Sequence, residues 1–297
     1  MRAPEVGQTA GENRCAMRDL NLEAADAYCR FLTSRHYENF SVASRLLDAR
    51  KRLDLARIYA YCRTTDDLGD ESPGASALPR LARWRSEVEA LFAGEPPVHP
   101  VLFALSHTIA QRTIPAQPFL DLIEANVMDQ RVKRYATWAE LERYCTLSAA
   151  PVGRMVLRVF EMDDPLAERL SDDVCIGLQL ANHAQDVSRD AVLGRSYLVE
   201  TDLAAGGSTG AVKALADRAR SLLDSGRALE ARAPLAFRLQ LALYRLGGLA
   251  ICRAIEATGY ETEQERPRVS TTTKVFLVVR AAIEALTASR PGEPSVT

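Results

Sequence analysis

Two pairs of aspartates are the side chains in this sequence that are best suited to chemistry. Asp66 and Asp70 form the first pair, and Asp186 and Asp190 form the second. The members of each pair are four residues apart, so they share one face wherever the chain is helical. Carboxylates stacked in this way repel each other by roughly 0.2–0.5 kcal/mol per pair. Because this unfavourable arrangement occurs in two places, we expect the carboxylates to bind a ligand.

The polar residues around the second pair extend the same helix face. Gln179 and Asn182 precede Asp186 and Asp190, and the successive steps are three, four and four residues. Mg²⁺ prefers a few carboxylates combined with water and substrate phosphates. Two acidic faces turned toward each other would therefore hold Mg²⁺ and, through it, a diphosphate. For the first pair, an acidic helix end exposed to solvent is the alternative interpretation.

Other residues could contribute to a binding site. Arg195 and Tyr197 lie in a short segment after the second pair, where they could bind phosphate oxygens. His36 precedes Phe40, and a single histidine is more often structural than a ligand. The sequence contains no zinc-type spacing of cysteine and histidine, no glycine-rich phosphate loop and no dinucleotide-binding fingerprint. It therefore favours neither a zinc enzyme nor a Rossmann-type dehydrogenase.

The composition is that of an ordinary globular protein. The 297 residues are 47% hydrophobic and 26% charged, and the net charge of −2 gives no general attraction to nucleic acid. Six cysteines without a CxxC pair suggest buried thiols in a reducing cytoplasm. Residues 1–13 lack the apolar core of a signal peptide, and no run of about 18 apolar residues predicts a membrane span. We therefore expect a cytoplasmic protein that could associate with the inner face of the membrane.

Hydrophobic periodicity predicts helices nearly throughout, without strand patterns. The expected helices span residues 18–34, 38–47, 51–71, 78–93, 99–112, 116–131, 137–161, 165–191, 208–225, 234–258 and 271–288. The predicted start signals are a capping box at Thr137 and first-turn prolines at Pro115, Pro165 and Pro234, and the predicted stops are Gly194 and Gly259. Residues 206–210 are expected to form a flexible link. We predict one all-α domain, residues 18–290, with helices around a central cavity and with tails at 1–17 and 291–297.

Three ordered segments carry a resemblance to a known family. They are residues 59–71 around the first aspartate pair, residues 144–155, and residues 179–190 with 195–198 directly after them. With these segments the chain resembles the squalene/phytoene synthase family, the head-to-head trans-isoprenyl diphosphate synthases, over about residues 36–280. The resemblance implies the all-α isoprenoid synthase class I fold. Residues 261–274, which include Arg268 and Lys274, resemble the family's basic C-terminal segment.

The resemblance also implies roles for individual side chains. Magnesium ligands on opposite cavity walls would be Asp66, Asp70, Asn182, Asp186 and Asp190. Diphosphate contacts would come from Arg63, Gln179, Asn182, Arg195 and Tyr197. Tyr144 would line the reaction centre, and Phe40 would lie at the cavity entrance near His36.

Within the family, residues 36–47 resemble the start of the bacterial hydroxysqualene synthases of hopanoid biosynthesis. This resemblance implies that presqualene diphosphate loses diphosphate and captures water, with Mg²⁺ and without NAD(P)H. Ser41 and His183 depart from that subgroup, which commonly has proline and an apolar residue at these positions. The implied partners are a prenyl diphosphate substrate, functional coupling to a presqualene diphosphate synthase and to a downstream oxidoreductase, and peripheral contact with a membrane, but no nucleic acid.

Other functions compete with this one. Inside the family, the enzyme could condense two farnesyl or geranylgeranyl diphosphates to presqualene diphosphate, squalene, dehydrosqualene or phytoene. A catalytically inactive member that acts as an assembly or binding protein is a different class, and the intact aspartate pairs disfavour it. A class I terpene cyclase is disfavoured by residues 144–155 and by Arg195 and Tyr197.

Overall fold

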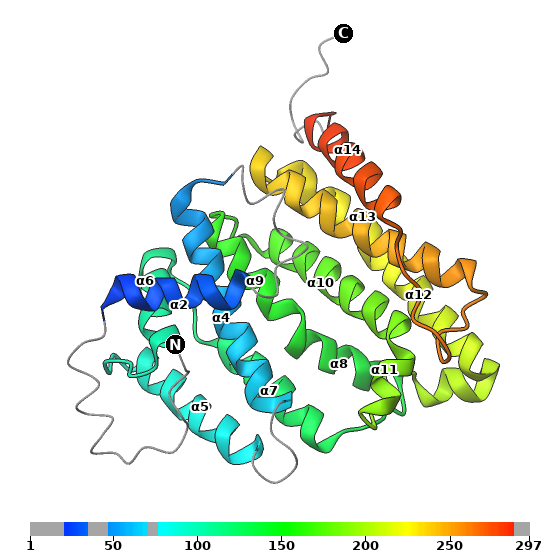
Figure 1. Cartoon of the computed structure of the whole chain (residues 1–297), viewed down its shortest axis with the longest axis horizontal. Helices are drawn as coiled ribbons and strands as arrows, with labels where there is room; N and C mark the ends of the chain where they lie inside the picture. The colour runs from blue at the N-terminus through cyan, green and yellow to red at the C-terminus, as the bar shows by residue number, and fades with distance from the viewer. Residues whose placement is uncertain (1–20, 35–46, 71–76, 288–297) are drawn as a thin grey trace.

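The computed structural model describes residues 21–34, 47–70 and 77–287. In these residues the secondary structure is helical apart from one isolated bridge between Tyr135 and Val199 (Figure 1). The helices are α2 (Leu22–Ser34), α4 (Ala49–Asp70), α5 (Ala77–Phe92), α6 (Pro100–Arg112), α7 (Gln117–Arg131), α8 (Trp138–Ser148), α9 (Ala150–Val159), α10 (Pro165–Gln185), α11 (Val187–Val192), α12 (Glu200–Arg232), α13 (Leu235–Ala257) and α14 (Thr271–Thr287). The predicted all-α fold class is confirmed.

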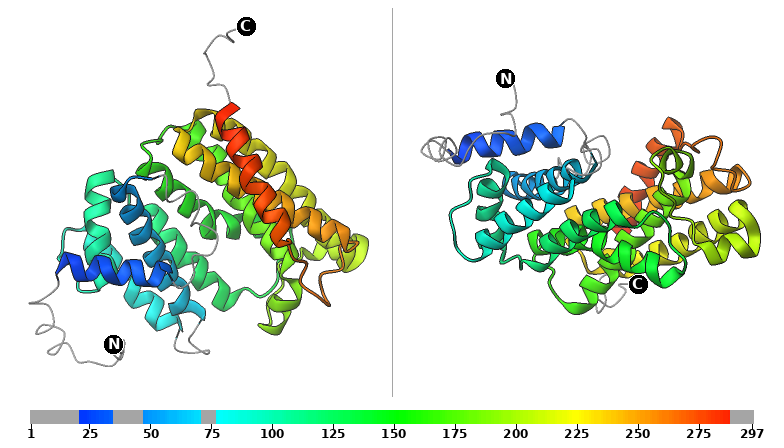
Figure 2. Two further views of the ribbon diagram at one scale, coloured as in Figure 1. Left: turned by 45° about the horizontal axis from the view of Figure 1, so that its top comes forward. Right: turned by 90° about the horizontal axis from the view of Figure 1, so that it is seen from below.

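The helix that carries the first aspartate pair, α4, and the helix that ends just before the second pair, α10, each lie at the centre of one half of the molecule. In the N-terminal half, α4 packs against α2, α5, α6 and α7. In the C-terminal half, α10 packs against α9, α12 and α13, and α14 lies along α13 at the edge (Figure 2). Because α7, α8 and α9 contact one another and reach both halves, they join α4 to α10.

The predicted helix over 165–191 is two helices that meet at Asp186. Asp164 caps the start of α10 by accepting the amide of Ala167 at 3.1 Å, and Pro165 occupies the first turn as predicted. Asp186 leaves the helical conformation with φ −99° and ψ 17°, and α11 continues from Val187. The amide of Asp190 still donates to the Asp186 carbonyl at 2.9 Å, so the spacing of one turn survives the break.

Other predicted boundaries also need correction. The helix expected over 137–161 divides at Ala149, because Pro151 has no amide hydrogen to continue the hydrogen-bond ladder. The expected flexible link at 206–210 lies inside α12, with a kink at Gly207, whose φ of 64° favours glycine. Pro115 lies before α7 and Pro234 is the N-cap of α13, so neither is a first-turn residue. The helix expected over 38–47 falls almost entirely outside the described residues.

Several end signals are confirmed. Thr137 caps α8 by accepting the Glu140 amide at 3.4 Å, and Glu140 accepts the Ala136 amide at 2.8 Å. Gly194 and Gly259 follow α11 and α13 with φ of 69° and 66°, the left-handed conformation that terminates helices.

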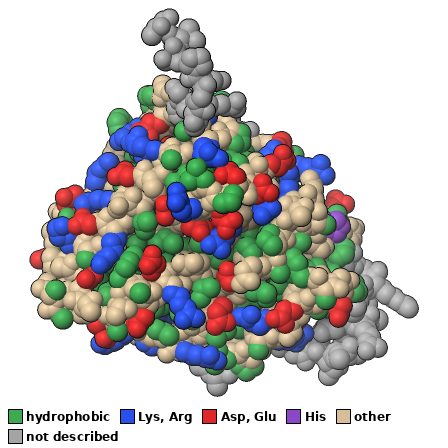
Figure 3. Space-filling model, turned by 180° about the vertical axis from the view of Figure 1, so that it is seen from behind, with side chains coloured by type: hydrophobic (Ala, Val, Ile, Leu, Met, Phe, Trp, Pro, Cys, Tyr) green, Lys and Arg blue, Asp and Glu red, His purple; other side chains and the backbone are tan. Residues whose placement is uncertain are grey.

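Within the described residues, one helix is long and apolar enough to cross a membrane by length and composition, namely α13. In the structure it is a core helix that packs against α10, α12 and α14. Its fully buried Arg245 donates to Glu230 of α12 at 2.6 Å, and it also pairs with Glu284 of α14. The buried charge of Arg245 is thus paired with acids of two neighbouring helices, as a charge in a protein interior requires. On the back face of the molecule, acidic and basic side chains are interspersed (Figure 3).

Candidate active site

The first aspartate pair lies in the last two turns of α4. The opposite face of this helix is buried in the core. The Tyr61 hydroxyl donates to the Phe119 carbonyl at 2.8 Å, and the Trp84 indole donates to the Thr65 hydroxyl at 3.0 Å. Both anchors are buried, so the helix cannot rotate without breaking them. Asp66 and Asp70 consequently face outward, and both side chains are exposed.

A close approach of α7 to α4 positions Asp66. Asn126 of α7 donates to the Asp66 carboxylate at 3.2 Å, and Gln130 donates to the Gly69 carbonyl at 3.2 Å. A Cβ atom at Gly69 would lie 2.4 Å from the Asn126 side-chain oxygen, so glycine permits this approach. Sequence reasoning missed Asn126 and Gln130, since only the fold brings them to α4.

The pKa of Asp66 is raised to about 6, chiefly because surrounding protein removes hydration, and the charges of Asp70 and Asp67 add to the effect. The hydrogen bond from Asn126 acts in the opposite direction. Although protein surrounds the carboxyl group, the Asp66 residue as a whole is exposed. A cation bound at this carboxylate would relieve the repulsion from Asp67 and Asp70.

Arg63 lies one turn before these acids. Its guanidinium pairs with Asp67 at 2.5 Å on the same helix, and its side chain is one-third exposed. Arg63, which is predicted to contact diphosphate, is therefore paired with Asp67 in this structure.

Asp129 of α7 connects the predicted site tyrosines. The Tyr144 hydroxyl donates to Asp129 at 2.9 Å, and the Tyr197 hydroxyl donates to it at 3.2 Å. The two rings stack with their centroids 5.4 Å apart. Burial raises the pKa of Asp129, while Arg195 and the two hydroxyls oppose the rise. The sequence signal for Asp129 was weak, because it is a single acid within an amphipathic helix.

Arg195 joins this tyrosine cluster to the first aspartate pair. Its guanidinium lies 3.2 Å from Asp70 of α4 and 4.0 Å from Asp129 of α7. Its side chain is only 16% exposed, so it is a fixed bridge between the two helices rather than a loosely held surface arginine. The structure thus brings together Asp70, Tyr144, Arg195 and Tyr197, four residues to which the family resemblance assigns site roles.

His183 links the second aspartate pair to the same cluster. Its ring stacks on Tyr197 with a centroid separation of 3.6 Å, and its two nitrogens lie 3.1 Å from the Gln179 amide and 3.9 Å from Asp190. Gln179 is therefore in the predicted site. Asn182, an implied ligand of both magnesium and diphosphate, is exposed on α10.

Asp186 is held by an arginine that sequence reasoning missed. Arg266, in the segment between α13 and α14, pairs with both Asp186 oxygens, and its Nη2 lies 3.3 Å from Oδ2. The segment was noted for Arg268 and Lys274, but both are exposed. The identity of the contacting arginine follows from the path of the chain, which local sequence does not specify.

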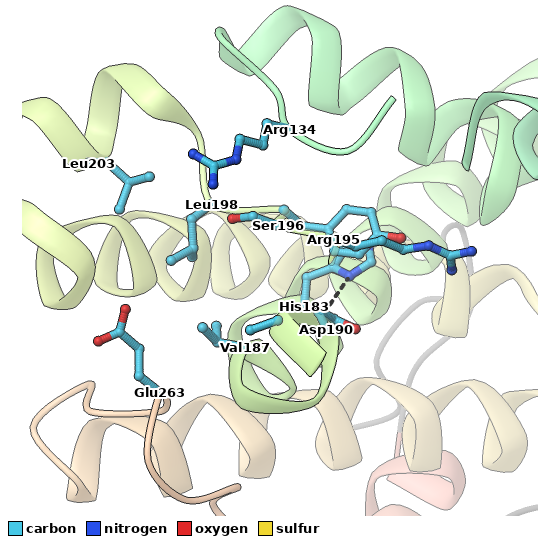
Figure 4. Close-up of a pocket in the computed structure, with 11 residues that line it drawn as sticks. Arg134, His183, Val187, Asp190, Arg195, Ser196, Leu198, Leu203 and Glu263 are labelled. Atoms are coloured by element: carbon cyan, nitrogen blue, oxygen red, sulfur yellow. Dashed lines mark ion pairs between the residues drawn. The ribbon is translucent and has the colours of Figure 1, made fainter. Parts of the chain in front are cut away.

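A pocket of about 230 Å³ adjoins the second aspartate pair. Figure 4 shows it enclosed between the segment after α11, the start of α12 and the loop that carries Glu263, with Arg134 above it. It is lined by Arg134, His183, Val187, Asp190, Ala191, Arg195, Ser196, Tyr197, Leu198, Leu203 and Glu263. Space for a ligand therefore exists beside the residues that the sequence had singled out.

The acidic residues fit Mg²⁺ in donor chemistry but not yet in geometry. Over the described ranges, no three acidic, histidine or cysteine side chains converge closely enough to hold a metal ion. One carboxylate of each pair is occupied by an arginine, Asp70 by Arg195 and Asp186 by Arg266. Hard oxygen donors on a cleft wall suit Mg²⁺, so magnesium binding stays a prediction. His36 and Phe40 lie outside the described residues.

The fold and the paired acidic helices define an all-α isoprenoid synthase, the architecture shared with squalene synthase-type structures. A family model described as squalene/phytoene synthase matches residues 33–273. The chain belongs to the squalene/phytoene synthase family.

Two solved structures show the extent of the likeness. Squalene synthase HpnC from Alicyclobacillus acidocaldarius is 43% identical, with a TM-score of 0.76 over 82% of this chain and 98% of that chain. A dehydrosqualene synthase is 24% identical, with a TM-score of 0.79 over 88% of this chain and 96% of that chain, and it supports the fold alone.

Among curated relatives, hydroxysqualene synthase of Rhodopseudomonas palustris is 34% identical over 71% of this chain and 73% of its own length. Phytoene synthase of Arthrospira platensis is also 34% identical, over 61% of this chain and 63% of its own length. The alignments with the phytoene synthases of Arthrospira platensis, Zea mays and Synechococcus elongatus span less than two thirds of those proteins.

Proposed function

We propose that this protein converts presqualene diphosphate into hydroxysqualene, with release of diphosphate and addition of a hydroxyl group from water. The observation that carries the proposal is the 34% identity to hydroxysqualene synthase of Rhodopseudomonas palustris over 73% of that protein. The alignment with this hydroxysqualene synthase covers 71% of this chain, compared with 61% for the phytoene synthase of Arthrospira platensis. The 43% identity to squalene synthase HpnC supports a squalene-type product.

The reaction begins with heterolysis of a carbon–oxygen bond, in which diphosphate leaves with the electron pair. Arg195 and Arg63 would bind its oxygens, since guanidinium groups match phosphates through paired hydrogen bonds. Mg²⁺ bound by Asp66, Asp70, Asn182, Asp186 and Asp190 would supply further neutralisation of the leaving group.

The carbocation that remains needs an apolar, electron-rich surface. Tyr135, Tyr144 and Tyr197 form a contiguous cluster of aromatic rings, and each is less than 8% exposed. The negative face of an aromatic ring attracts a cation. Because the hydroxyl hydrogens of Tyr144 and Tyr197 point to Asp129, they are not directed at the cation.

Water ends the reaction. A water oxygen donates a lone pair to the rearranged cation, the new carbon–oxygen bond forms, and one proton is lost to solvent. Since no hydride is transferred, this reaction requires no NAD(P)H. Coupling to a presqualene diphosphate synthase and to a downstream oxidoreductase, and a cytoplasmic location at the membrane surface, stay predictions.

Incubation of the purified protein with presqualene diphosphate and Mg²⁺ in ¹⁸O-labelled water tests the proposal. The expected product is a C30 alcohol that carries ¹⁸O and forms without NADPH. Formation of squalene, strictly dependent on NADPH, would overturn the proposal in favour of a squalene synthase. Incubation with two farnesyl or geranylgeranyl diphosphates in parallel shows whether the protein instead performs head-to-head condensation.

A further inference from the structure

Arg266 occupies the carboxylate that the proposed function assigns to metal. Its Nε and Nη2 atoms engage the two oxygens of Asp186, so one planar guanidinium covers both potential metal-binding atoms. The side chains of Arg266 and Asp186 are 37% and 21% exposed. The pair lies at the break between α10 and α11, one turn before Asp190.

This pairing is built into the fold by a buried amide. Gln185, the last residue of α10, is 4% exposed. Its side-chain oxygen accepts from Arg266 Nη2 at 2.9 Å, and its side-chain nitrogen donates to the Pro267 carbonyl at 2.6 Å. Both ends of one amide therefore fix residues 266–267 onto the end of α10, which holds the guanidinium over Asp186. Loosely solvated surface ion pairs have no such second anchor.

We propose that Arg266 is an exchangeable counter-ion of Asp186. In the metal-free protein it neutralises the carboxylate; when Mg²⁺ and diphosphate enter together, Asp186 turns to the cation and the guanidinium turns to the diphosphate. This inference rests on the proposed function, and it assigns Arg266 a direct role in binding the diphosphate. Charge balance favours the exchange. The Asp186 carboxylate loses the guanidinium but gains a divalent cation, and the guanidinium pairs with the diphosphate anion instead.

This exchange predicts that removal of Arg266 changes the affinities for metal and for diphosphate in opposite directions. Without diphosphate, Arg266 competes with metal for Asp186, so its removal should strengthen the binding of metal alone. With metal present, Arg266 contributes a charge-assisted fork to the diphosphate, so its removal should weaken diphosphate binding. A residue that only supports the local structure would weaken both when replaced.

The experiment compares the wild-type protein with Arg266→Gln and Arg189→Gln. Arg189 is a matched control, because its guanidinium lies 3.8 Å from the same Asp186 oxygen but is 68% exposed and lacks the Gln185 anchor. The affinity for Mn²⁺ alone is measured from the free-ion electron paramagnetic resonance signal. The affinity for inorganic diphosphate at saturating Mg²⁺ is measured by titration calorimetry.

Arg266→Gln should bind Mn²⁺ alone about 3- to 10-fold more tightly, because a competing charge next to the site is gone. It should bind diphosphate about 10-fold or more weakly. Arg189→Gln should change neither affinity more than about 2-fold, as expected of an exposed charge. Arg266→Lys, which keeps the charge but not the fork, should fall between wild type and Arg266→Gln for both ligands.

Weaker or unchanged Mn²⁺ binding by Arg266→Gln, with wild-type melting temperature, would overturn the proposal. Equal effects of the Arg189 and Arg266 variants would also overturn it, because they would show a general charge effect. A wild-type protein that forms hydroxysqualene but shows either result would retain its proposed function and lose only this inference. Failure of the wild type to act on presqualene diphosphate would instead reject the proposed function.

Discussion

The Asp129 carboxylate accepts a hydrogen bond from the Tyr144 hydroxyl at 2.9 Å, which ties α7 to α8 at the candidate active site. The second oxygen of Asp129 accepts from Tyr197 at 3.2 Å. One partly buried carboxylate therefore sets the orientation of two site rings that are 53 residues apart in the chain. The relationship explains how an acid outside both aspartate pairs can influence the reaction.

Replacement of Asp129 by asparagine should lower kcat by about 10- to 100-fold, the effect of about 1.5–3 kcal/mol expected for hydrogen bonds to a charged group. The asparagine oxygen can accept from one tyrosine, but its amide nitrogen offers a donor to the other. The measurement is kcat and KM with presqualene diphosphate, together with the product distribution.

Asp121→Asn is the matched control for this variant, because Asp121 is another acid of α7, is buried, and accepts a hydrogen bond from Gln117 at 2.7 Å. It should retain wild-type kcat. A wild-type kcat and product distribution for Asp129→Asn would contradict the assigned role of Asp129.

Asp66→Ala and Asp186→Ala should each abolish measurable turnover and leave the helical fold intact. Carboxylates on one helix face repel each other, so the loss of one costs the metal-free protein little stability. Turnover is followed by product formation, and the fold is followed by circular dichroism and melting temperature. Substantial activity of both variants with Mg²⁺ would reject the metal-binding assignment.

The pH dependence of stability should report the raised pKa of Asp66. The carboxyl group titrates at about 6 in the folded protein and near 3.8 otherwise, so the folded state binds the proton more tightly. Its ionisation therefore destabilises the fold increasingly as the pH rises from about 4 to about 6. Asp66→Asn, which still accepts from Asn126, should raise the metal-free melting temperature at pH 8, and the gain should vanish below pH 4.

Asp48→Ala is a control for which the melting temperature at pH 8 should change in the opposite direction. The pKa of Asp48 is lowered to about 2, first by the side-chain and then by the backbone hydrogen bond of Lys51. Ionised Asp48 thus stabilises the fold above about pH 4, and that contribution is lost as the pH falls toward 2. Asp48→Ala should therefore lower the melting temperature at pH 8. Parallel shifts for the Asp48 and Asp66 variants would contradict the raised pKa of Asp66.

Mg²⁺ together with inorganic diphosphate should raise the melting temperature by more than the sum of the two separate shifts. A ligand that binds only the native state stabilises it by mass action, and each of these ligands completes the site of the other. Differential scanning fluorimetry with Mg²⁺, with diphosphate and with both measures the effect. Purely additive shifts would argue against a shared site.

Sequence patterns located the aspartates but not the residues that hold them. The spacing of Asp66 and Asp70 predicts a shared helix face, because helical periodicity is local information. The contacts of Asn126 and Asp129 depend on how α7 packs against α4 and α8, which periodicity does not specify. The break at Asp186 had no glycine or proline signal, and the pairing of Arg266 with Asp186 spans 80 residues.

The contact between α4 and α7 makes Gly69 a sharp test of the site architecture. A Cβ atom at this position would lie 2.4 Å from the Asn126 oxygen, so Gly69→Ala must displace the side chain that binds Asp66. We expect a loss of about 1–3 kcal/mol in unfolding free energy, as for other overpacked positions, and reduced turnover.

Gly210→Ala in α12 is the matched control, because nothing lies within 4 Å of its added Cβ. That variant should gain about 0.4–1 kcal/mol with unchanged turnover. Urea denaturation and kcat measure both variants, and a Gly69→Ala protein as stable and active as wild type would contradict the close approach of α7 to α4.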